Sequence, residues 1–367
     1  MDDRRAAMAK KAEKIVLCIV LSLLCASLSC ITGNDHMENE TLKLLRKSEK
    51  KFNEVYAGKE IDLSNSDMSA MKIKKANLTG ANLRGANLTK TVFKKCILEK
   101  ADLSGSIINE TAFDTCQMNE IKMIKTTFNT VFFVNCKMKH SDIHGSEFNK
   151  AQFEKTTLGR SNLAQITIED GVFYKSEVQD CKIMNSKFLK IVINDTNFIG
   201  SDMTDSTIQG SIVECSLFAK CILVRANFSG TSFEGRLFSA PDFREANAKD
   251  ANFSHCRING ASMLHINLEG ADFSNAVIFL LDLQEANVKN AKFKDVYFNA
   301  VNFGHSDLTN VDFTRSTFDK WVKLNDTKLE GAIFESVILL RNPRVDLTDT
   351  IYEGKTLPGA RISMPND

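Results

Sequence analysis

The chain has 367 residues, 43% hydrophobic and 25% charged, a composition typical of folded proteins and not of disordered chains. Its 47 Lys and Arg balance 46 Asp and Glu, a formal net charge of +1, which excludes both an overall basic field for nucleic acid and an overall acidic field that imitates DNA. The 25 Phe against 1 Trp and 4 Tyr form an unusual ratio that favours internal repetition.

The first thirty residues have the order of an export signal. Basic residues, Arg4 to Lys14, precede an apolar run at 15–28, and small residues follow around Cys30. The apolar run is shorter than the roughly 20 residues that span a bilayer as a helix. We therefore expect residues 1–30 to form a signal peptide, starting at Met1 or at Met8, and the protein to be exported to the cell envelope.

The end of this signal resembles that of a bacterial lipoprotein, in which a small residue precedes a Cys that is lipidated after cleavage. Cys30 is the candidate lipidation site, but Ser27 stands where such signals have Leu, and Leu28 stands where they have a small residue. Ordinary cleavage nearby and an uncleaved anchor are the alternatives. Several acyl chains on Cys30 would hold the protein stably to a membrane.

A polar segment at 31–60 follows the signal. Within it Leu42, Leu45, Phe52 and Tyr56 recur at roughly helical spacing. This pattern predicts a short amphipathic helix that caps the next domain, and a tether between the domain and a membrane is the alternative.

From Leu63 to Phe318 an apolar residue recurs every five positions, at 52 successive sites. The residue two before each site is nearly always Ala, Ser, Thr, Cys, Val or Ile. A period of five fits neither an α-helix nor a flat strand, because it moves the apolar residue around a helix and alternates it across a sheet. The chain is therefore expected to turn every five residues.

This repeat resembles that of the pentapeptide-repeat family, in which Ala, then Asp or Asn, then Leu or Phe precede two variable residues. The best matches start at Ala76, Ala81, Ala86, Ala101, Ala226, Ala251 and Ala271. The resemblance implies an all-β fold, a right-handed quadrilateral β-helix with four repeats per coil, whose central and small residues point inward. It covers 61–340 as about 13 coils without an inserted loop, spaced by about 4.8 Å, and an irregular tail follows at 341–367.

With 20 residues per coil, residues 20 apart share a face. One face then has ten Phe among its thirteen central residues, which predicts rings stacked along one side of the core. The set is Ile73, Phe93, Phe113, Phe133, Phe153, Phe173, Ile193, Val213, Phe233, Phe253, Phe273, Phe293 and Phe313. Arg236 and Pro241 at inward sites predict a distortion at 235–245 with a thin core at Ala248. The phase also slips by one residue at Lys320–Trp321.

Chemically reactive residues occupy positions that favour structural roles. Six Cys fall on the small inward site, namely Cys96, Cys116, Cys136, Cys181, Cys221 and Cys256. We interpret them as small buried hydrophobes, with a disulfide or metal ladder as the alternative. His140 and His144 flank Asp142 but are expected on an exposed corner, so we predict no metal site. Outward carboxylates recur on one face and are interpreted as a solvated wall, comprising Asp102, Asp142, Asp202, Asp242 and Asp282.

One outward row is apolar. It lies on the Phe-rich face, and we predict that it docks a partner, although exposed β-branched residues also suit a strand without any partner. The stripe comprises Val92, Ala112, Phe132, Val172, Val192 and Ile212, interrupted by Gln152, with Leu217 and Leu237 on the next face.

These features favour a non-enzymatic exported rod, anchored by lipid if Cys30 is acylated, that presents the stripe to a protein partner or to a second copy. The sequence has no phosphate-binding loop, nucleophile elbow or zinc motif, so we expect no cofactor and no nucleic-acid partner. The alternative comes from the family, whose quinolone-resistance members imitate DNA and bind type II topoisomerases. Because they act in the cytoplasm through a negative surface, the signal and the balanced charge count against it.

Overall fold

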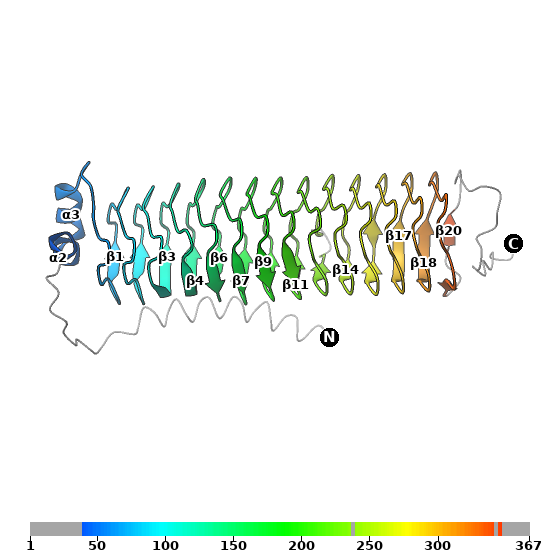
Figure 1. Cartoon of the computed structure of the whole chain (residues 1–367), viewed down its shortest axis with the longest axis horizontal. Helices are drawn as coiled ribbons and strands as arrows, with labels where there is room; N and C mark the ends of the chain where they lie inside the picture. The colour runs from blue at the N-terminus through cyan, green and yellow to red at the C-terminus, as the bar shows by residue number, and fades with distance from the viewer. Residues whose placement is uncertain (1–38, 236–238, 341–343, 347–367) are drawn as a thin grey trace. The chain divides into compact units, whose positions relative to one another are not determined.

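The computed structural model describes residues 39–235, 239–340 and 344–346. In this part of the chain two short helices, α2 (Glu40–Lys47) and α3 (Glu49–Val55), precede an all-parallel β-solenoid of about 13 turns (Figure 1). Most residues pair with a residue 20 positions further on, such as Ile73 with Phe93. Each coil therefore has four faces, which we call A, B, C and D.

Face A contains Lys72–Lys74 and the residues in register with them. The following faces along the chain contain Asn77 (B), Asn82 (C) and Asn87 (D) with their partners. The strands of face A are β1 (Lys72–Lys74), β2 (Val92–Lys94), β3 (Ile108–Asp114), β4 (Thr127–Val134), β6 (Gln152–Glu154), β8 (Val172–Tyr174), β10 (Val192–Asn194), β12 (Ile212–Glu214), β13 (Ser232–Glu234), β14 (Arg257–Asn259), β15 (Val277–Phe279), β17 (Tyr297–Asn302), β18 (Thr317–Lys323) and β19 (Ile338–Leu339). The remaining strands are β5 (Glu147–Asn149), β7 (Thr167–Glu169), β9 (Lys187–Leu189) and β11 (Thr207–Gln209) on face D, and β16 (Leu281–Asp282) and β20 (Arg344–Asp346) on face B.

A backbone residue with positive φ turns the chain at the corners. Lys75, Gly80 and Gly85 have φ of 55°, 68° and 67°, and the pattern continues at five-residue steps along the stack. At the corner around Gly80, the Ala81 N–H donates to the Leu78 carbonyl at 3.0 Å. This hydrogen bond with positive φ at the third residue is the pattern of a type II turn. It explains why the apolar residues recur every five positions.

The small inward site satisfies backbone groups as well as space. Where it holds Ser, Thr or Cys, the side chain donates to the carbonyl of the central residue in the preceding coil. Examples are Thr91 Oγ1 to the Met68 carbonyl at 2.7 Å and Cys181 Sγ to the Leu158 carbonyl at 3.1 Å. Buried polar groups cost little when they are hydrogen-bonded, so these residues are tolerated in an otherwise apolar interior.

The outward Asp or Asn of the repeat supports the next turn. Asp62 Oδ1 accepts from the Ser64 N–H at 3.0 Å and from Asn82 Nδ2 of the next coil at 3.1 Å. The hydrogen bonds from Ser64 hold the pKa of the Asp62 carboxyl below its usual value. The residue between the two inward ones thus links neighbouring coils through its side chain.

Helices α2 and α3 cover the first coil of the stack. Leu42, Leu45 and Phe52 are buried, and Ser48 separates the helices by accepting from the Lys51 N–H at 3.3 Å. Asn53 Nδ2 donates to the Lys75 carbonyl at 2.9 Å while its Oδ1 accepts from the Asn77 N–H at 2.8 Å. The helices therefore occupy backbone groups that an open sheet edge would offer to another chain.

The predicted uninterrupted stack is wrong at one coil. Up to Ser232 the register advances by 20 residues, but Leu217 pairs with Asp242 and Ser232 pairs with Arg257, an advance of 25. Five extra residues, 236–240, therefore lie within this coil, where a distortion was expected. Gly235 is required there because a Cβ would lie 2.9 Å from the Asn259 carbonyl oxygen.

This extra repeat also corrects the predicted Phe face. Face A continues from Phe233 to Ile258 and Ile278, whereas Phe253 follows Phe228 on face D. Two long ring stacks result instead of one. The stack on face A comprises Phe93, Phe113, Phe133, Phe153 and Phe173, with centroids 4.7–5.2 Å apart. The stack on face D comprises Phe228, Phe253, Phe273, Phe293, Phe313 and Phe334, with centroids 4.8–5.4 Å apart.

The core is not thin at Ala248. Phe228, Phe233 and Phe243, from three different faces, meet in the interior with centroids 5.3–6.3 Å apart. The small Ala248 side chain on the fourth face leaves room for these rings. The phase slip near Lys320 is confirmed, because Phe298 pairs with Phe318 but Ala300 pairs with Trp321.

All seven Cys in the described part of the chain are free and buried. Six occupy the predicted inward site, and Cys215 lies at a corner. Burial raises the pKa of the Cys181 and Cys221 thiols to about 12. The structure therefore supports the small-hydrophobe interpretation.

We predict that Leu280→Gly stabilises the fold. Leu280 is 57% exposed and has φ of 54°, a conformation that costs an L-residue about 1–2 kcal/mol, while glycine adds about 0.5–1 kcal/mol of chain entropy. Chemical denaturation should show an unfolding free energy higher by about 0.5–1 kcal/mol. Ile212→Gly on a strand serves as the control and should destabilise. A lower unfolding free energy for Leu280→Gly would contradict the corner analysis.

We also predict that the six inward thiols resist alkylation in the folded protein. Reagents attack the thiolate, and burial both blocks access and disfavours that form. Iodoacetamide at pH 8 followed by peptide mapping should label none of these six residues until the chain is unfolded. Rapid labelling of Cys181 or Cys221 in the native protein would show that the interior is open.

Candidate interaction surface

The predicted stripe forms a continuous row on face A. Neighbouring strands pair Val92 with Ala112, Ala112 with Phe132 and, through Gln152, Val172 with Val192 and Ile212. Because each strand lies one coil from the next, these side chains follow one another along the stack at about 4.8 Å. The row ends where Ser232 and Arg257 follow Ile212. We call the row from Val92 to Ile212 the stripe.

The stripe residues differ in exposure. Ile212 is 36% exposed, Val92, Ala112, Val172 and Val192 are half-buried, and Phe132 is only 3% exposed. The Phe132 ring therefore offers little area for docking. Leu217 lies on face B between Asn197 and Asp242 and outside the stripe, and Leu237 lies outside the described residues.

A second row on face A carries charge in a defined order, which the sequence analysis missed. We call it the flanking row, because its members lie two residues after the stripe positions. It runs Lys74, Lys94, Asp114, Val134, Glu154, Tyr174, Asn194, Glu214 and Glu234. Lys94 contacts Asp114 at 2.7 Å, and Asn194 donates to Glu214 at 2.5 Å. The row is basic at the end near the helices, apolar or mixed in the middle and acidic at the other end.

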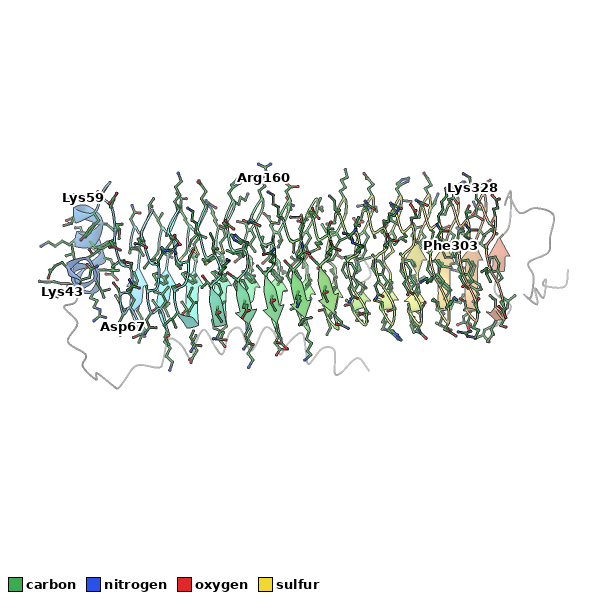
Figure 2. The ribbon with its side chains drawn as sticks, viewed as in Figure 1. Lys43, Lys59, Asp67, Arg160, Phe303 and Lys328 are labelled. Atoms are coloured by element: carbon green, nitrogen blue, oxygen red, sulfur yellow. The ribbon has the colours of Figure 1, made fainter. Side chains whose placement is uncertain are left out.

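Residues near the helices add to the basic end. Residues 39–100 contain 14 Lys and Arg against 7 Asp and Glu, although the whole chain is nearly neutral. Lys72, Lys74 and Lys75 are exposed, and Figure 2 shows Lys43 and Lys59 on the helical cap at the same end of the solenoid. The charge of the chain is therefore distributed unevenly along the stack.

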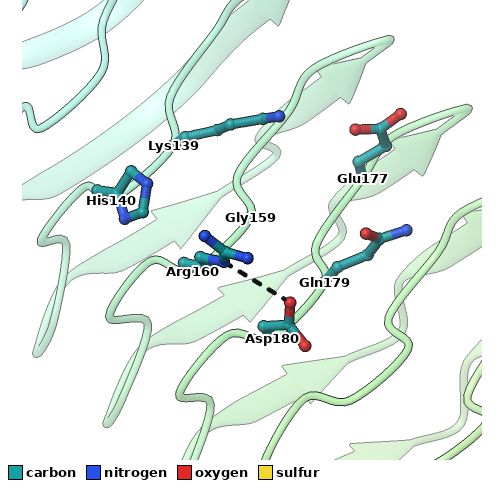
Figure 3. Close-up of a pocket in the computed structure, with 7 residues that line it drawn as sticks. All are labelled: Lys139, His140, Gly159, Arg160, Glu177, Gln179 and Asp180. Atoms are coloured by element: carbon teal, nitrogen blue, oxygen red, sulfur yellow. Dashed lines mark ion pairs between the residues drawn. The ribbon is translucent and has the colours of Figure 1, made fainter.

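A shallow hollow of about 210 Å³ lies on face B (Figure 3). Gly159 has no side chain to fill the space between neighbouring coils, and Arg160 contacts Asp180 at 3.9 Å across the edge of the hollow. The lining residues are Lys139, His140, Gly159, Arg160, Glu177, Gln179 and Asp180. Each is exposed or half-buried, and opposite charges lie side by side, so the hollow lacks the buried polar groups that orient a ligand.

The predicted wall of carboxylates is divided between two faces. Asp102, Asp142 and Asp202 belong to face C, whereas Asp242 and Asp282 belong to face B because of the extra repeat. His144 Nδ1 lies 2.7 Å from Asp142 Oδ1, but His140 lies on the edge of face B. Within the described residues no group of three or more His, Cys, Asp and Glu side chains is arranged to hold a metal ion.

Ion pairs follow the corner between faces B and C. Lys100 lies 3.8 Å from Glu120, Lys220 lies 3.6 Å from Glu245, and His265 Nδ1 lies 3.3 Å from Glu285. These side chains are about half exposed or more, so each pair contributes at most about 1 kcal/mol. We interpret this corner as a solvated surface.

The N-terminal predictions lie outside the described residues. This applies to the signal peptide and to the candidate lipidation site Cys30. Among the residues that the structure describes, no helix is both long and apolar enough to cross a membrane.

Comparison with known proteins agrees with the repeat geometry. The model of the pentapeptide repeat region matches residues 86–163, and that of pentapeptide repeats in eight copies matches 238–275 and 281–319. No curated protein sequence matches the chain significantly.

Similar solved structures include HetL, a pentapeptide repeat protein involved in heterocyst differentiation regulation from the cyanobacterium Nostoc sp. strain PCC 7120 (18% identity, 68% of this chain and 97% of that chain, TM-score 0.21). QnrB1, a plasmid-mediated fluoroquinolone resistance protein, is also similar (15% identity, 59% and 89%, TM-score 0.29), as is the A-module of the mannuronan C-5 epimerase AlgE6 from Azotobacter vinelandii (9% identity, 87% and 97%, TM-score 0.33). The family assignment rests on the matched repeats and on the five-residue turns. The chain belongs to the pentapeptide-repeat family.

Proposed function

We propose that this protein is a non-enzymatic exported rod that binds another protein through face A. The observation that carries the proposal is the stripe, a row of apolar side chains in register on one face, flanked by charges of opposite sign at its two ends. The stacked coils hold these side chains in fixed positions, so little conformational entropy is lost when a partner binds.

The interior supports a scaffold rather than a catalyst. Central Leu, Ile, Met and Phe side chains fill it at nearly zero exposure, so substrate has no space between the faces. Thiols in the interior are buried and hydrogen-bonded. The hollow on face B places exposed carboxylates beside exposed cations, which does not favour acid or base catalysis.

Export is part of the proposal and follows from the basic, apolar and small segments of residues 1–30. Acylation of Cys30 would fix the basic end of the solenoid near a membrane. Intact mass and the N-terminal peptide of protein from its native host would separate an acylated Cys30, simple cleavage and an intact N-terminus. An intact N-terminus on a cytoplasmic protein would contradict export.

DNA mimicry receives less support from the charges. A mimic needs a continuous negative surface, whereas face A begins with Lys72, Lys74 and Lys94, and residues 39–100 carry twice as many basic as acidic residues. Topoisomerase binding is therefore the second candidate, to be tested if the protein is found in the cytoplasm.

We predict that a photo-crosslinking residue placed on face A captures protein, whereas the same residue on other faces does not. Val172 and Val192 are the test positions. Ile107 on face D and Ile222 on face C are matched controls, because they are apolar and 58% and 42% exposed. In the native host, adducts should form from the test positions only. No adduct, or equal adducts from all four positions, would contradict a docking role for face A.

A further inference from the structure

We propose that a second copy of this chain docks on face A in the antiparallel direction, with a twofold axis at Gln152. The inference rests on the proposed docking role of face A and names its partner. It follows from the order of side chains along the stripe and the flanking row, which matches its own reverse.

The geometry of a symmetric pair fixes which residues meet. Two identical faces in contact are related by a twofold axis that lies in the plane between them. When that axis is perpendicular to the stack, the stripe meets the partner's stripe and the flanking row meets the partner's flanking row, each in reverse order. The only remaining variable is the coil through which the axis passes.

With the axis at Gln152, the stripe meets itself with apolar contacts. Four coils before the axis corresponds to four coils after it, so Lys72 lies opposite Ser232. Closer to the axis, the register places Val92 opposite Ile212, Ala112 opposite Val192 and Phe132 opposite Val172. Every stripe residue except Gln152 itself thus meets an apolar residue.

The same axis gives charge complementarity in the flanking row. Lys74 lies opposite Glu234 and Lys94 lies opposite Glu214, while Val134 lies opposite Tyr174. Both Lys–Glu pairs occur twice because of the symmetry. Glu234 also contacts Arg257 of its own chain at 3.4 Å, so the pair of Lys94 with Glu214 carries more of this complementarity.

A parallel arrangement of the two copies fails on charge. An axis along the stack would place the stripe of one copy against the flanking row of the other at the same coil. Lys72 would then meet Lys74, and Ile212 would meet Glu214. Like charges placed opposite each other and charges placed against apolar groups are both unfavourable. The charge order therefore selects the antiparallel direction.

The central coil and the contact area limit the affinity. Glu154 meets its own symmetry mate, and it lies 3.3 Å from Lys155 of the same chain, which reduces the repulsion. Nine coils of about 4.8 Å and strands about 10 Å wide give a buried area of about 800 Å² over both copies. This area lies at the low end for specific interfaces, so we expect a dissociation constant in the micromolar range.

The first experiment measures self-association of the purified full chain by sedimentation velocity from about 1 to 200 µM. The unmodified protein should shift from monomer to dimer with concentration. Val172→Asp with Val192→Asp should weaken the dimer at least tenfold, whereas Ile107→Asp with Ile222→Asp, the matched control on other faces, should not. A chain that stays monomeric throughout, or a dimer that survives the face A substitutions, would overturn the proposal.

A charge exchange tests the register. Lys94→Glu and Glu214→Lys should each weaken the dimer, and the double variant should restore it, because each exchanged residue then faces its opposite in the other copy. Lys182→Glu on face C, a matched change of charge, should have no effect. Thermal unfolding checks that each variant is folded, since Lys94 also contacts Asp114 of its own chain. A double variant as weak as the single variants would overturn the register.

Single cysteines locate the axis. Gln152→Cys should react with its symmetry mate through a bismaleimide that spans about 10 Å, the distance between packed sheets. Val192→Cys lies two coils from the axis, so its symmetry mate is about 19 Å away along the stack and should not react. Crosslinking at Val192 but not at Gln152 would place the axis elsewhere and overturn the proposal.

The outcomes also separate this inference from the proposed function. If photo-crosslinks from Val172 and Val192 contain a different protein and the chain is monomeric, face A remains a docking surface and the self-docking inference fails. If neither position captures anything, both fail.

Discussion

The structure depends on one backbone constraint, a residue with positive φ at nearly every fifth position. Each such residue closes a turn, so the central and small residues always point inward and the other three face out. Coils formed in this way hydrogen-bond to their neighbours in register, and stability accumulates along the stack. The same constraint places outward side chains in straight rows. A surface of this kind is defined by the order of residues along a row, and the charge order on face A is readable for that reason.

The interior could be predicted from the sequence almost completely, but the assignment of faces could not. The inward positions follow from the five-residue period alone. The extra repeat at 236–240 keeps this period, with Phe238 in phase, and changes only the 20-residue period of the coil. An apolar count along the sequence is therefore unaffected by it, and every face prediction after Phe233 moved by one side. The slip near Lys320 was visible because it adds one residue and breaks the phase.

The candidate surface was predictable only in part. The stripe from Val92 to Ile212 lies before the extra repeat, so its members stay on one face. The burial of Phe132 could not be predicted, because it depends on side chains of neighbouring coils. The charge order was present in the sequence at the positions two after each stripe residue, but it has meaning only once the register is known. At the cap, helical spacing predicted one helix, whereas Ser48 divides the segment into two.

The central claim is that coils of four five-residue turns determine the fold and that residues 236–240 are additional to them. Thermal unfolding of a variant lacking 236–240 tests it most directly, because the deletion joins Gly235 to Pro241 and restores a 20-residue coil. We predict cooperative unfolding with an unchanged or higher midpoint, since a shorter connection costs less entropy. Deletion of 196–200 is the control, because it leaves a coil of 15 residues that cannot close in register. Loss of folding on deleting 236–240, or equal effects of the two deletions, would contradict the account.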